Sequence, residues 1–294
     1  MLISPFRYLP RHDIALLCTL TKVYLGIIMR LRRMDLTNKL YKVFLIAGSE
    51  PLGTAGMQAD IKSVSACGGY AAGAITCIVD EDTIKVKSIH TIPPKMVTDQ
   101  AYSFLEDVGA DCIKTGMLYS KELVVAIGEV IKKQSIPVVI DPVMVSSVGD
   151  KLLQDDAIQA YKDCLFPYST IITPNRREAD LLLGKSLTKD NMKEYIPELS
   201  KWGNCVIVKS IEDGDCLIDV FYNPASKCFK LYKKARIQTK NVNGTGDTFA
   251  SSIATYLARG YDMNTAVDKA ENFIYNAILY GSNVKFGRSE ERRV

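Results

Sequence analysis

One short stretch, Asn243–Thr248, combines the residue types that phosphoryl transfer requires. Gly244 and Gly246 permit backbone angles that other residues rarely adopt, and the apolar run Phe249–Leu257 predicts a helix directly after them. The N–H groups at a helix start attract an anion. Asp247 would repel a bound phosphate, but it could take a proton from a hydroxyl that attacks a nearby phosphorus atom. An ordinary helix N-cap with an acidic first turn would explain the same residues, so the rest of the chain must decide.

The composition excludes several classes of function. Of the 294 residues, 47% are hydrophobic and 24% are charged, which is typical of a globular protein in solution. The net charge is only +4, and the sequence has no basic stripe interleaved with aromatic residues, so we expect no nucleic-acid partner. The two histidines, His12 and His90, are too few for a histidine-rich metal site and argue against a Ser-His-Asp triad. Eight cysteines without a Cys-x-x-Cys pair indicate reduced thiols and a cytoplasmic location.

Residues 1–33 differ from the chain that follows. Ile14–Met29 is largely apolar, but Lys22 interrupts this run, which is too short for a comfortable membrane span. The positive charge of Arg30–Arg33 lies after the apolar run, whereas a signal peptide carries its charge before it. We therefore expect an extension that is disordered or a start-site artefact, followed by a single domain at residues 34–294. A membrane anchor is the less favoured alternative.

Strands and helices are predicted to alternate along the domain. The predicted strands are Lys42–Ala47, Tyr70–Val79, Cys112–Thr115, Pro137–Asp141, Ser169–Thr173, Cys205–Lys209, Cys216–Tyr222 and Cys228–Lys233. The predicted helices are Met57–Cys67, Lys95–Val108, Lys121–Lys133, Asp155–Leu165, Arg177–Leu183, Met192–Lys201, 248–259 and 264–279. This alternation favours an α/β fold with a mostly parallel sheet.

Polar residues occupy the ends of several predicted strands. They are Ser49, Asp141, Asn175 and Lys209. Each of them alone is more typical of a loop cap than of a site. Because ligands of open α/β sheets bind at the carboxyl ends of the strands, the set as a whole predicts a site at that edge.

Several motifs, in this order along the chain, resemble one family. They are Gly48–Pro51, Gly53–Asp60, Lys114–Leu118, Asp141–Met144, Thr173–Ala179 and Asn243–Thr248. Over about residues 41–285 the chain resembles the ribokinase-like superfamily, and within it the branch of hydroxymethylpyrimidine/phosphomethylpyrimidine kinases and pyridoxal kinases. The resemblance implies a three-layer αβα sandwich and, for the assembly, a homodimer.

The resemblance also implies an activity. Enzymes of this branch transfer the γ-phosphate of ATP to a primary hydroxymethyl group on a flat heteroaromatic ring. Asp247 matches their catalytic base, and Gly244, Thr245 and Gly246 match the anion hole that stabilises the transferred phosphoryl group.

ATP and Mg²⁺ are the cofactors that this resemblance implies. Asn175, Lys209 and Asn243 match ATP-binding positions, and Asp141 and Glu178 match positions that place the metal ion. The family often has glycines after the lysine. This chain has Ser210 and Ile211 there instead, which is a departure from the family pattern at this ATP contact.

Six positions match those with which the family holds its substrate ring. They are Gly48, Ala55, Asp60, Glu81, Met117 and Val143. Pyrimidine kinases usually carry Gln at the position of Glu81 and Cys at the position of Asp247. An ionised Glu accepts hydrogen bonds but cannot donate them, which would suit a protonated pyridine nitrogen or a phenolic hydroxyl. The alternative for Glu81 is an exposed acid in the run Asp80–Asp82.

We therefore predict pyridoxal, pyridoxine or pyridoxamine as the first choice of acceptor. Hydroxymethylpyrimidine is a close second, and one enzyme could phosphorylate both. Two remoter alternatives are a sugar or nucleoside kinase and a vitamin-binding regulator without catalytic activity.

Overall fold

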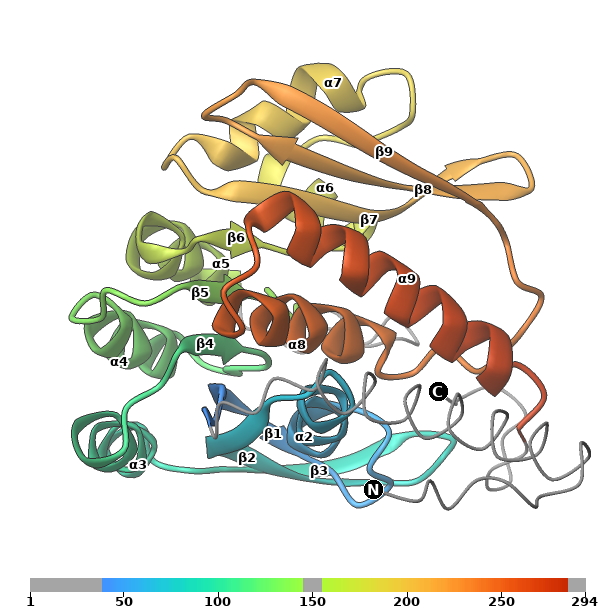
Figure 1. The fold of residues 1–294 in the computed structure, drawn as a ribbon. Coiled ribbons are helices and arrows are strands. Elements are labelled where there is room, and N and C mark those ends of the chain that lie inside the picture. The colour runs from blue at the N-terminus through green and yellow to red at the C-terminus, as the bar shows by residue number, and fades with distance from the viewer. Residues whose placement is uncertain (1–38, 145–154, 285–294) are drawn as a thin grey trace, which may run out of the picture. The chain divides into compact units, whose positions relative to one another are not determined.

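The computed structural model describes residues 39–144 and 155–284, so the predicted extension at residues 1–33 lies outside the described residues. In the described part of the chain, one sheet holds nine strands in the order β3-β2-β1-β4-β5-β6-β7-β8-β9 (Figure 1). The strands are β1 Lys42–Ser49, β2 Tyr70–Glu81, β3 Val86–Thr91, β4 Cys112–Thr115, β5 Val138–Ile140, β6 Ile171–Ile172, β7 Cys205–Asp213, β8 Cys216–Asn223 and β9 Cys228–Ala235.

The centre of the sheet is parallel and its edges are antiparallel. Strands β2, β1, β4, β5, β6 and β7 pair in parallel, whereas β3 pairs antiparallel with β2, and β8 and β9 continue antiparallel from β7. The mostly parallel sheet confirms the predicted α/β class. All carboxyl ends of the parallel strands meet at one edge, which is where a ligand site is expected.

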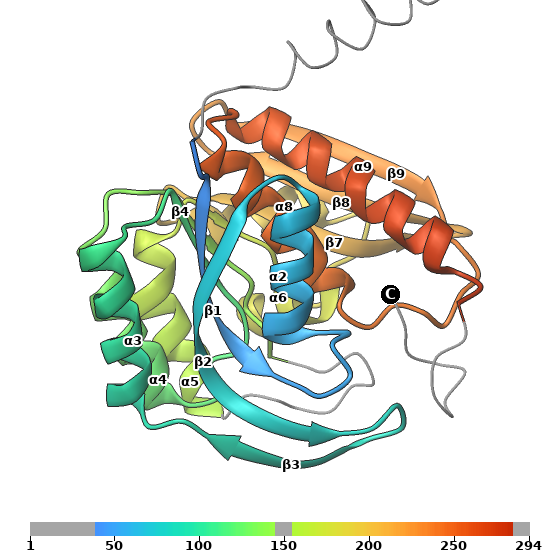
Figure 2. The same ribbon diagram turned by 60° about the horizontal axis from the view of Figure 1, so that its bottom comes forward.

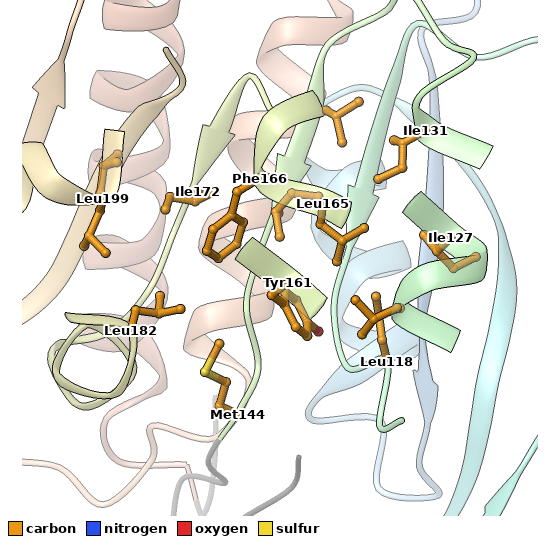
Figure 3. Close-up of a cluster of buried hydrophobic side chains, with 14 of the residues drawn as sticks. Leu118, Ile127, Ile131, Met144, Tyr161, Leu165, Phe166, Ile172, Leu182 and Leu199 are labelled. Carbon is orange, nitrogen blue, oxygen red and sulfur yellow. The ribbon is translucent and has the colours of Figure 1, made fainter. Parts of the chain in front are cut away.

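Helices cover both faces of the sheet (Figure 2). They are α2 Gly56–Ala66, α3 Pro94–Asp107, α4 Lys121–Ile131, α5 Asp155–Ala160, α6 Arg176–Leu183, α7 Met192–Tyr195, α8 Thr245–Ala258 and α9 Met263–Gly281. Side chains of α3, α4, α5 and α6 pack in one apolar cluster, part of which Figure 3 shows, and those of α2, α8 and α9 pack in another. The alternation of β1 explains this division, because Phe44 and Ile46 face the first cluster whereas Val43 and Leu45 face the second.

Several boundaries differ from the prediction. The predicted helix Asp155–Leu165 is α-helical only as far as Ala160 and continues as a π-helix, Tyr161–Leu165. Helix α7 changes to a 3₁₀ helix, Ile196–Ser200, at whose start Pro197 cannot donate the N–H that an α-helix needs.

Strand β3 is missing from the prediction altogether. Its sequence, Val-Lys-Ser-Ile-His-Thr, carries few apolar residues, and most of its side chains are exposed. An edge strand that pairs on one side only has little to bury, so its apolar pattern is weak. Figure 2 shows how β2 bends along its length before the chain turns back as β3.

None of the helices in the described ranges combines the length and the apolar character that a membrane span requires.

Candidate active site

A cavity of about 770 Å³ lies at the carboxyl edge of the parallel strands. Its walls include every residue predicted for the site except Asp60. These wall residues are Gly48, Ala55, Glu81, Met117, Asp141, Val143, Asn175, Glu178, Lys209, Asn243, Gly244, Thr245, Gly246 and Asp247. The tertiary structure therefore brings together residues that lie up to 199 positions apart in the chain.

Helix α8 begins at Thr245, so Asp247 lies in its first turn rather than in the turn before it. Gly244 is the N-cap, with a φ of 77°, and a Cβ atom there would lie 1.7 Å from the carbonyl oxygen of Thr54. Only glycine fits this close approach in a left-handed conformation. Thr245 donates its N–H to Val242, and the N–H groups of Gly246 and Asp247 follow in the first helical turn, where the helix itself offers no acceptor.

Two donors hold the carboxylate of Asp247. The backbone N–H of Gly56 donates to Oδ2 and the ammonium group of Lys114 donates to Oδ1, both at 3.1 Å. Each donor fixes one oxygen, so both the position and the plane of the carboxylate are defined. The Asp247 side chain is 14% exposed, which leaves it accessible from the cavity.

Lys114 lies behind Asp247 and is fully buried on β4. Its Nζ also donates to both oxygens of Asp60, at 2.7 and 2.8 Å, and Ser251 donates to the same carboxylate at 2.6 Å. Burial raises the pKa of Asp60 to about 7, against the effect of the Lys114 ammonium. Burial alone would lower the pKa of Lys114, but the neighbouring carboxylates raise it, so Lys114 is charged. We call Asp60, Lys114 and Asp247 the base cluster.

Asp60 lies apart from the other residues predicted for the site. It was expected to contact the substrate ring, but its side chain is fully buried on α2 and is absent from the cavity wall. The salt bridge with Lys114 holds it beneath the site.

The loop between β1 and α2 is organised by one carboxylate. Glu50 is buried and accepts hydrogen bonds from the backbone N–H groups of Leu52, Gly53, Thr54 and Ala55. The Asn243 side chain donates to Thr54 at 2.9 Å. This loop supports Gly244 on one side and ends at Gly56, which holds Asp247.

A second group of charges faces the start of α8. Lys209 donates to Asp141 at 3.2 Å, and Thr173 donates to the same carboxylate oxygen at 2.8 Å. A Cβ atom on Gly246 would lie 3.4 Å from Lys209 Nζ and 3.5 Å from Asp141 Oδ2. The lysine ammonium therefore lies beside the helix start that attracts an anion.

Asn175 and Glu178 form a capping box at the start of α6. The Asn175 side chain accepts from the N–H of Glu178 at 3.0 Å, and Glu178 accepts from the N–H of Asn175 at 2.8 Å and from that of Met144 at 3.3 Å. Burial, together with the charge of Asp141, raises the pKa of Glu178 to about 8. We call Asp141, Glu178 and Lys209 the phosphate-side cluster.

The phosphate-side cluster fits a magnesium ion that is bound partly by phosphate. Among the residues that the structure describes, no group of three or more His, Cys, Asp or Glu side chains could hold a metal ion alone. Mg²⁺ is usually bound through one or two carboxylates, several waters and substrate phosphates. The buried carboxyls of Asp141 and Glu178 at the cavity wall match that donor set.

Ser210 keeps the backbone conformation that a glycine would adopt. Its φ is 62°, in the left-handed region, and its N–H donates to Asp219 at 2.6 Å. Although Ser210 replaces the glycine of the family pattern, the chain after Lys209 follows the same path that a glycine would give, so a ligand can still approach it. The left-handed backbone of Ser210 is strained as a result.

Two groups of apolar residues line the cavity and come from different elements. Val79, Val86 and Ile89 belong to the β2–β3 hairpin, which also contributes Glu81. Ile237, Val242, Ile274 and Ile278 come from the segment before α8 and from α9. Asp247 and the phosphate-side cluster line the same cavity.

Three residues that hold the site are absent from the predicted set of site residues. Lys114, Glu50 and Gly56 were noted only as parts of motifs, yet each supports Asp247 or its neighbouring loop. For Lys114 a signal was present, because a lysine within a short buried strand needs a paired acid. The four amides that Glu50 accepts cannot be inferred from spacing.

Comparisons with known proteins show the family to which the chain belongs. The family model described as phosphomethylpyrimidine kinase matches residues 50–291. The chain is 34% identical over 249 residues to the hydroxymethylpyrimidine/phosphomethylpyrimidine kinase of Staphylococcus aureus (strain Mu50 / ATCC 700699), which covers 83% of this chain and 90% of that protein. It is 38% identical over 241 residues to the thiamine biosynthesis bifunctional protein ThiED of Geobacter sulfurreducens, which covers 80% of this chain. The chain spans only 49% of the length of that bifunctional relative.

Solved structures of two kinds are similar to the chain. A phosphomethylpyrimidine kinase from Clostridium difficile 630 is 32% identical with a TM-score of 0.72, over 82% of this chain and 100% of that one. The pyridoxal kinase from Staphylococcus aureus in complex with AMP-PCP and pyridoxal is 30% identical with a TM-score of 0.77, over 87% of this chain and 92% of that one. The fold is thus common to both kinds of kinase and does not choose between their acceptors.

Proposed function

We propose that the chain, which belongs to the phosphomethylpyrimidine kinase family, is a phosphotransferase that transfers the γ-phosphoryl group of ATP to the hydroxymethyl group of a heteroaromatic vitamin precursor. The observation that carries the proposal is the placement of Asp247. Its carboxylate is held by two donors at the wall of a cavity, in the first turn of a helix whose Gly246 lies beside the lysine of the phosphate-side cluster. The solved relative with AMP-PCP supports ATP as the donor.

In this proposal the residues of the chain divide the work. Asp247 accepts the proton of the hydroxymethyl group while that oxygen forms a bond to the γ-phosphorus, and the bond from phosphorus to ADP breaks. The N–H groups of Gly246 and Asp247 stabilise the charge on the transferred group, together with the ammonium of Lys209. Asp141 and Glu178 would hold Mg²⁺, which supplies positive charge that offsets the phosphates of ATP.

For the acceptor we propose 4-amino-5-hydroxymethyl-2-methylpyrimidine first. The support is the name of the Staphylococcus aureus relative, which covers nearly the same length. Pyridoxal, the first choice from the sequence, is the second candidate, because the comparisons do not specifically support it. It is favoured by Glu81, an acceptor of hydrogen bonds at the cavity wall, and by a pyridoxal kinase among the similar structures.

A direct assay tests the proposal. Purified protein with ATP and Mg²⁺ is supplied separately with hydroxymethylpyrimidine, its monophosphate, pyridoxal and ribose, and products are identified by mass spectrometry. We expect phosphorylation of hydroxymethylpyrimidine with the highest kcat/KM. Turnover of ribose alone would place the chain with the sugar kinases, and ligand binding without ATP consumption would support a regulator.

Replacement of Glu81 by Gln separates the two candidate rings. The amide can donate as well as accept, so Glu81→Gln should shift the ratio of kcat/KM towards the aminopyrimidine by about tenfold, or 1.4 kcal/mol, which is the scale of one added hydrogen bond. Glu106→Gln, an exposed acid on α3, is the matched control. An unchanged ratio would show that Glu81 does not contact the ring.

Two further properties belong to the proposal. We propose a cytoplasmic location, which the scattered cysteines of the sequence indicate, and a homodimer, which the resemblance implies. Light scattering of the purified protein tests the second, since a monomeric mass at micromolar concentration would exclude a stable dimer.

A further inference from the structure

Lys114 is a fully buried cation beneath the cavity. Its side chain and that of Asp60 are both 0% exposed, and neither residue lines the cavity wall. A buried lysine is costly to desolvate, so its retention needs partners that compensate for the lost water. Those partners come from two helices on the same side of the sheet, α2 with Asp60 and α8 with Asp247.

The hydrogen-bonding capacity of Lys114 is completely used. An ammonium group has three N–H donors, and Nζ has three acceptor atoms within reach. Two are the oxygens of Asp60, at 2.7 and 2.8 Å, and the third is Oδ1 of Asp247, at 3.1 Å. Asp60 thus fixes the ammonium, and the ammonium in turn fixes one oxygen of Asp247.

The geometry around Gly116 leaves space for this arrangement. A Cβ atom at that position would lie 3.1 Å from Lys114 Nζ and 3.7 Å from Asp247 Oδ1. Because Gly116 has no side chain, Lys114 can reach the carboxylate of Asp247 from its position on β4. The resemblance gives no role to the lysine of the motif Lys114–Leu118. The contact with Asp247 supplies one.

We infer that Lys114, held in place by Asp60, is a positioning residue that orients the carboxylate of Asp247 towards the acceptor hydroxyl. The inference rests on the proposed phosphoryl transfer and adds to it a residue that touches neither substrate. With Oδ1 bound to Lys114 and Oδ2 bound to Gly56, the carboxylate cannot rotate away from the cavity as the negatively charged phosphates of ATP enter.

A paired replacement tests the inference without leaving a buried charge alone. Asp60→Asn combined with Lys114→Met removes the cation and its main counter-ion together, whereas loss of either alone would leave an uncompensated charge. We expect kcat to fall about 100-fold, the scale of a misplaced catalytic group, with the KM for ATP nearly unchanged. Thr255→Val, which removes a buried hydrogen bond to the Ser251 carbonyl elsewhere on α8, controls for general loss of stability.

A double-mutant cycle distinguishes positioning from a merely structural role. If Lys114 acts through Asp247, the paired replacement should have little further effect on kcat in an Asp247→Asn background. Two effects that multiply in the combined variant would overturn the inference. A kcat within threefold of wild type for the paired replacement would overturn it as well.

A crystal structure of the paired variant gives an outcome that does not depend on turnover. We expect the Asp247 carboxylate to turn about its Cβ–Cγ bond, away from the orientation set by Lys114 and Gly56. An unchanged carboxylate would contradict the inference even if activity were lost.

Absence of turnover in the wild-type protein with every acceptor would instead count against the proposed function, so the two failures are distinguishable. If the paired variant does not fold, Asp60→Asn alone is used. We expect kcat to fall about tenfold, because the amide no longer holds the Lys114 ammonium with two carboxylate oxygens and the Asp247 carboxylate is then less well positioned. A kcat equal to that of wild type would overturn the inference.

Discussion

The base cluster and the phosphate-side cluster have the same composition but different connections. Each contains two carboxyls and one lysine. In the base cluster the lysine contacts both carboxylates. In the phosphate-side cluster Lys209 forms a salt bridge with Asp141. The oxygens of Glu178 instead accept hydrogen bonds from backbone N–H groups.

This difference shows which cluster is complete without a ligand. Lys114 uses all three of its donors within the base cluster, so that cluster needs no external cation. In the phosphate-side cluster, burial and the charge of Asp141 raise the pKa of Glu178 to about 8. A divalent ion with bound phosphates would relieve the repulsion between these two carboxyls, which supports Mg²⁺ at this cluster.

The largest effect on activity is expected from replacing Asp247, the member of the base cluster that lies at the cavity wall. Asp247→Asn keeps the shape of the side chain but removes the base, so kcat should fall by about 10²–10⁴-fold, the contribution of a general base. Binding of ATP, followed by calorimetry, should change little because Lys209 and the helix start are intact. Near-normal turnover would show that Asp247 is not the base.

A smaller effect is expected from the phosphate-side cluster. Glu178→Gln removes one carboxyl next to the proposed metal ion, so the Mg²⁺ concentration for half-maximal activity should rise about 10–100-fold. The KM for the acceptor should stay close to wild type. Glu198→Gln, an exposed acid paired with Lys185, is the matched control. An unchanged Mg²⁺ dependence would show that Glu178 does not help to hold the metal ion, and it would contradict the proposed difference between the two clusters.

Glu271 offers a reference carboxyl that belongs to neither cluster. It is buried on α9 beside Lys234, and burial together with the charge of Asp219 raises its pKa to about 7. Since the folded state keeps this proton after the unfolded chain has released it, the contribution to stability is full below about pH 4.5 and is lost as the pH rises to about 7.

Urea unfolding at pH 5 and pH 8 checks this sign. Wild type should lose more stability between the two values than Glu271→Gln, which cannot titrate. An equal loss in both proteins would assign the pH dependence to other buried carboxyls such as Asp60.

The smallest expected effect concerns Ser210, next to Lys209. Ser210→Gly relieves the left-handed backbone at a φ of 62° and should raise the free energy of unfolding by about 0.5–1 kcal/mol. Activity should stay within twofold of wild type, because the path of the chain is already that of a glycine. A loss of stability would indicate that the hydroxyl of Ser210 makes a contact of its own.

Local patterns in the sequence account for much of the fold. Strand β4 was predicted with its observed bounds, and the helices that became α2, α3 and α4 were placed within two residues, because buried strands and amphipathic helices carry regular apolar spacing. Strand β3 was missed because an exposed edge carries no such spacing. The π-helix after α5 and the 3₁₀ helix after α7 follow from packing and from Pro197, which periodicity alone does not reveal.

The sequence by itself determined the alternation of strands and helices, the glycine-rich start of α8 and the presence of an acid next to that start. These are local properties, set by backbone freedom, side-chain period and helix capping. Only the tertiary structure decided what surrounds that acid. Gly56 and Lys114 contact Asp247 from 191 and 133 positions away, and Asp60 turned out to hold the lysine rather than face the cavity. Contacts between distant segments depend on how helices pack on the sheet, and no spacing within one segment encodes them.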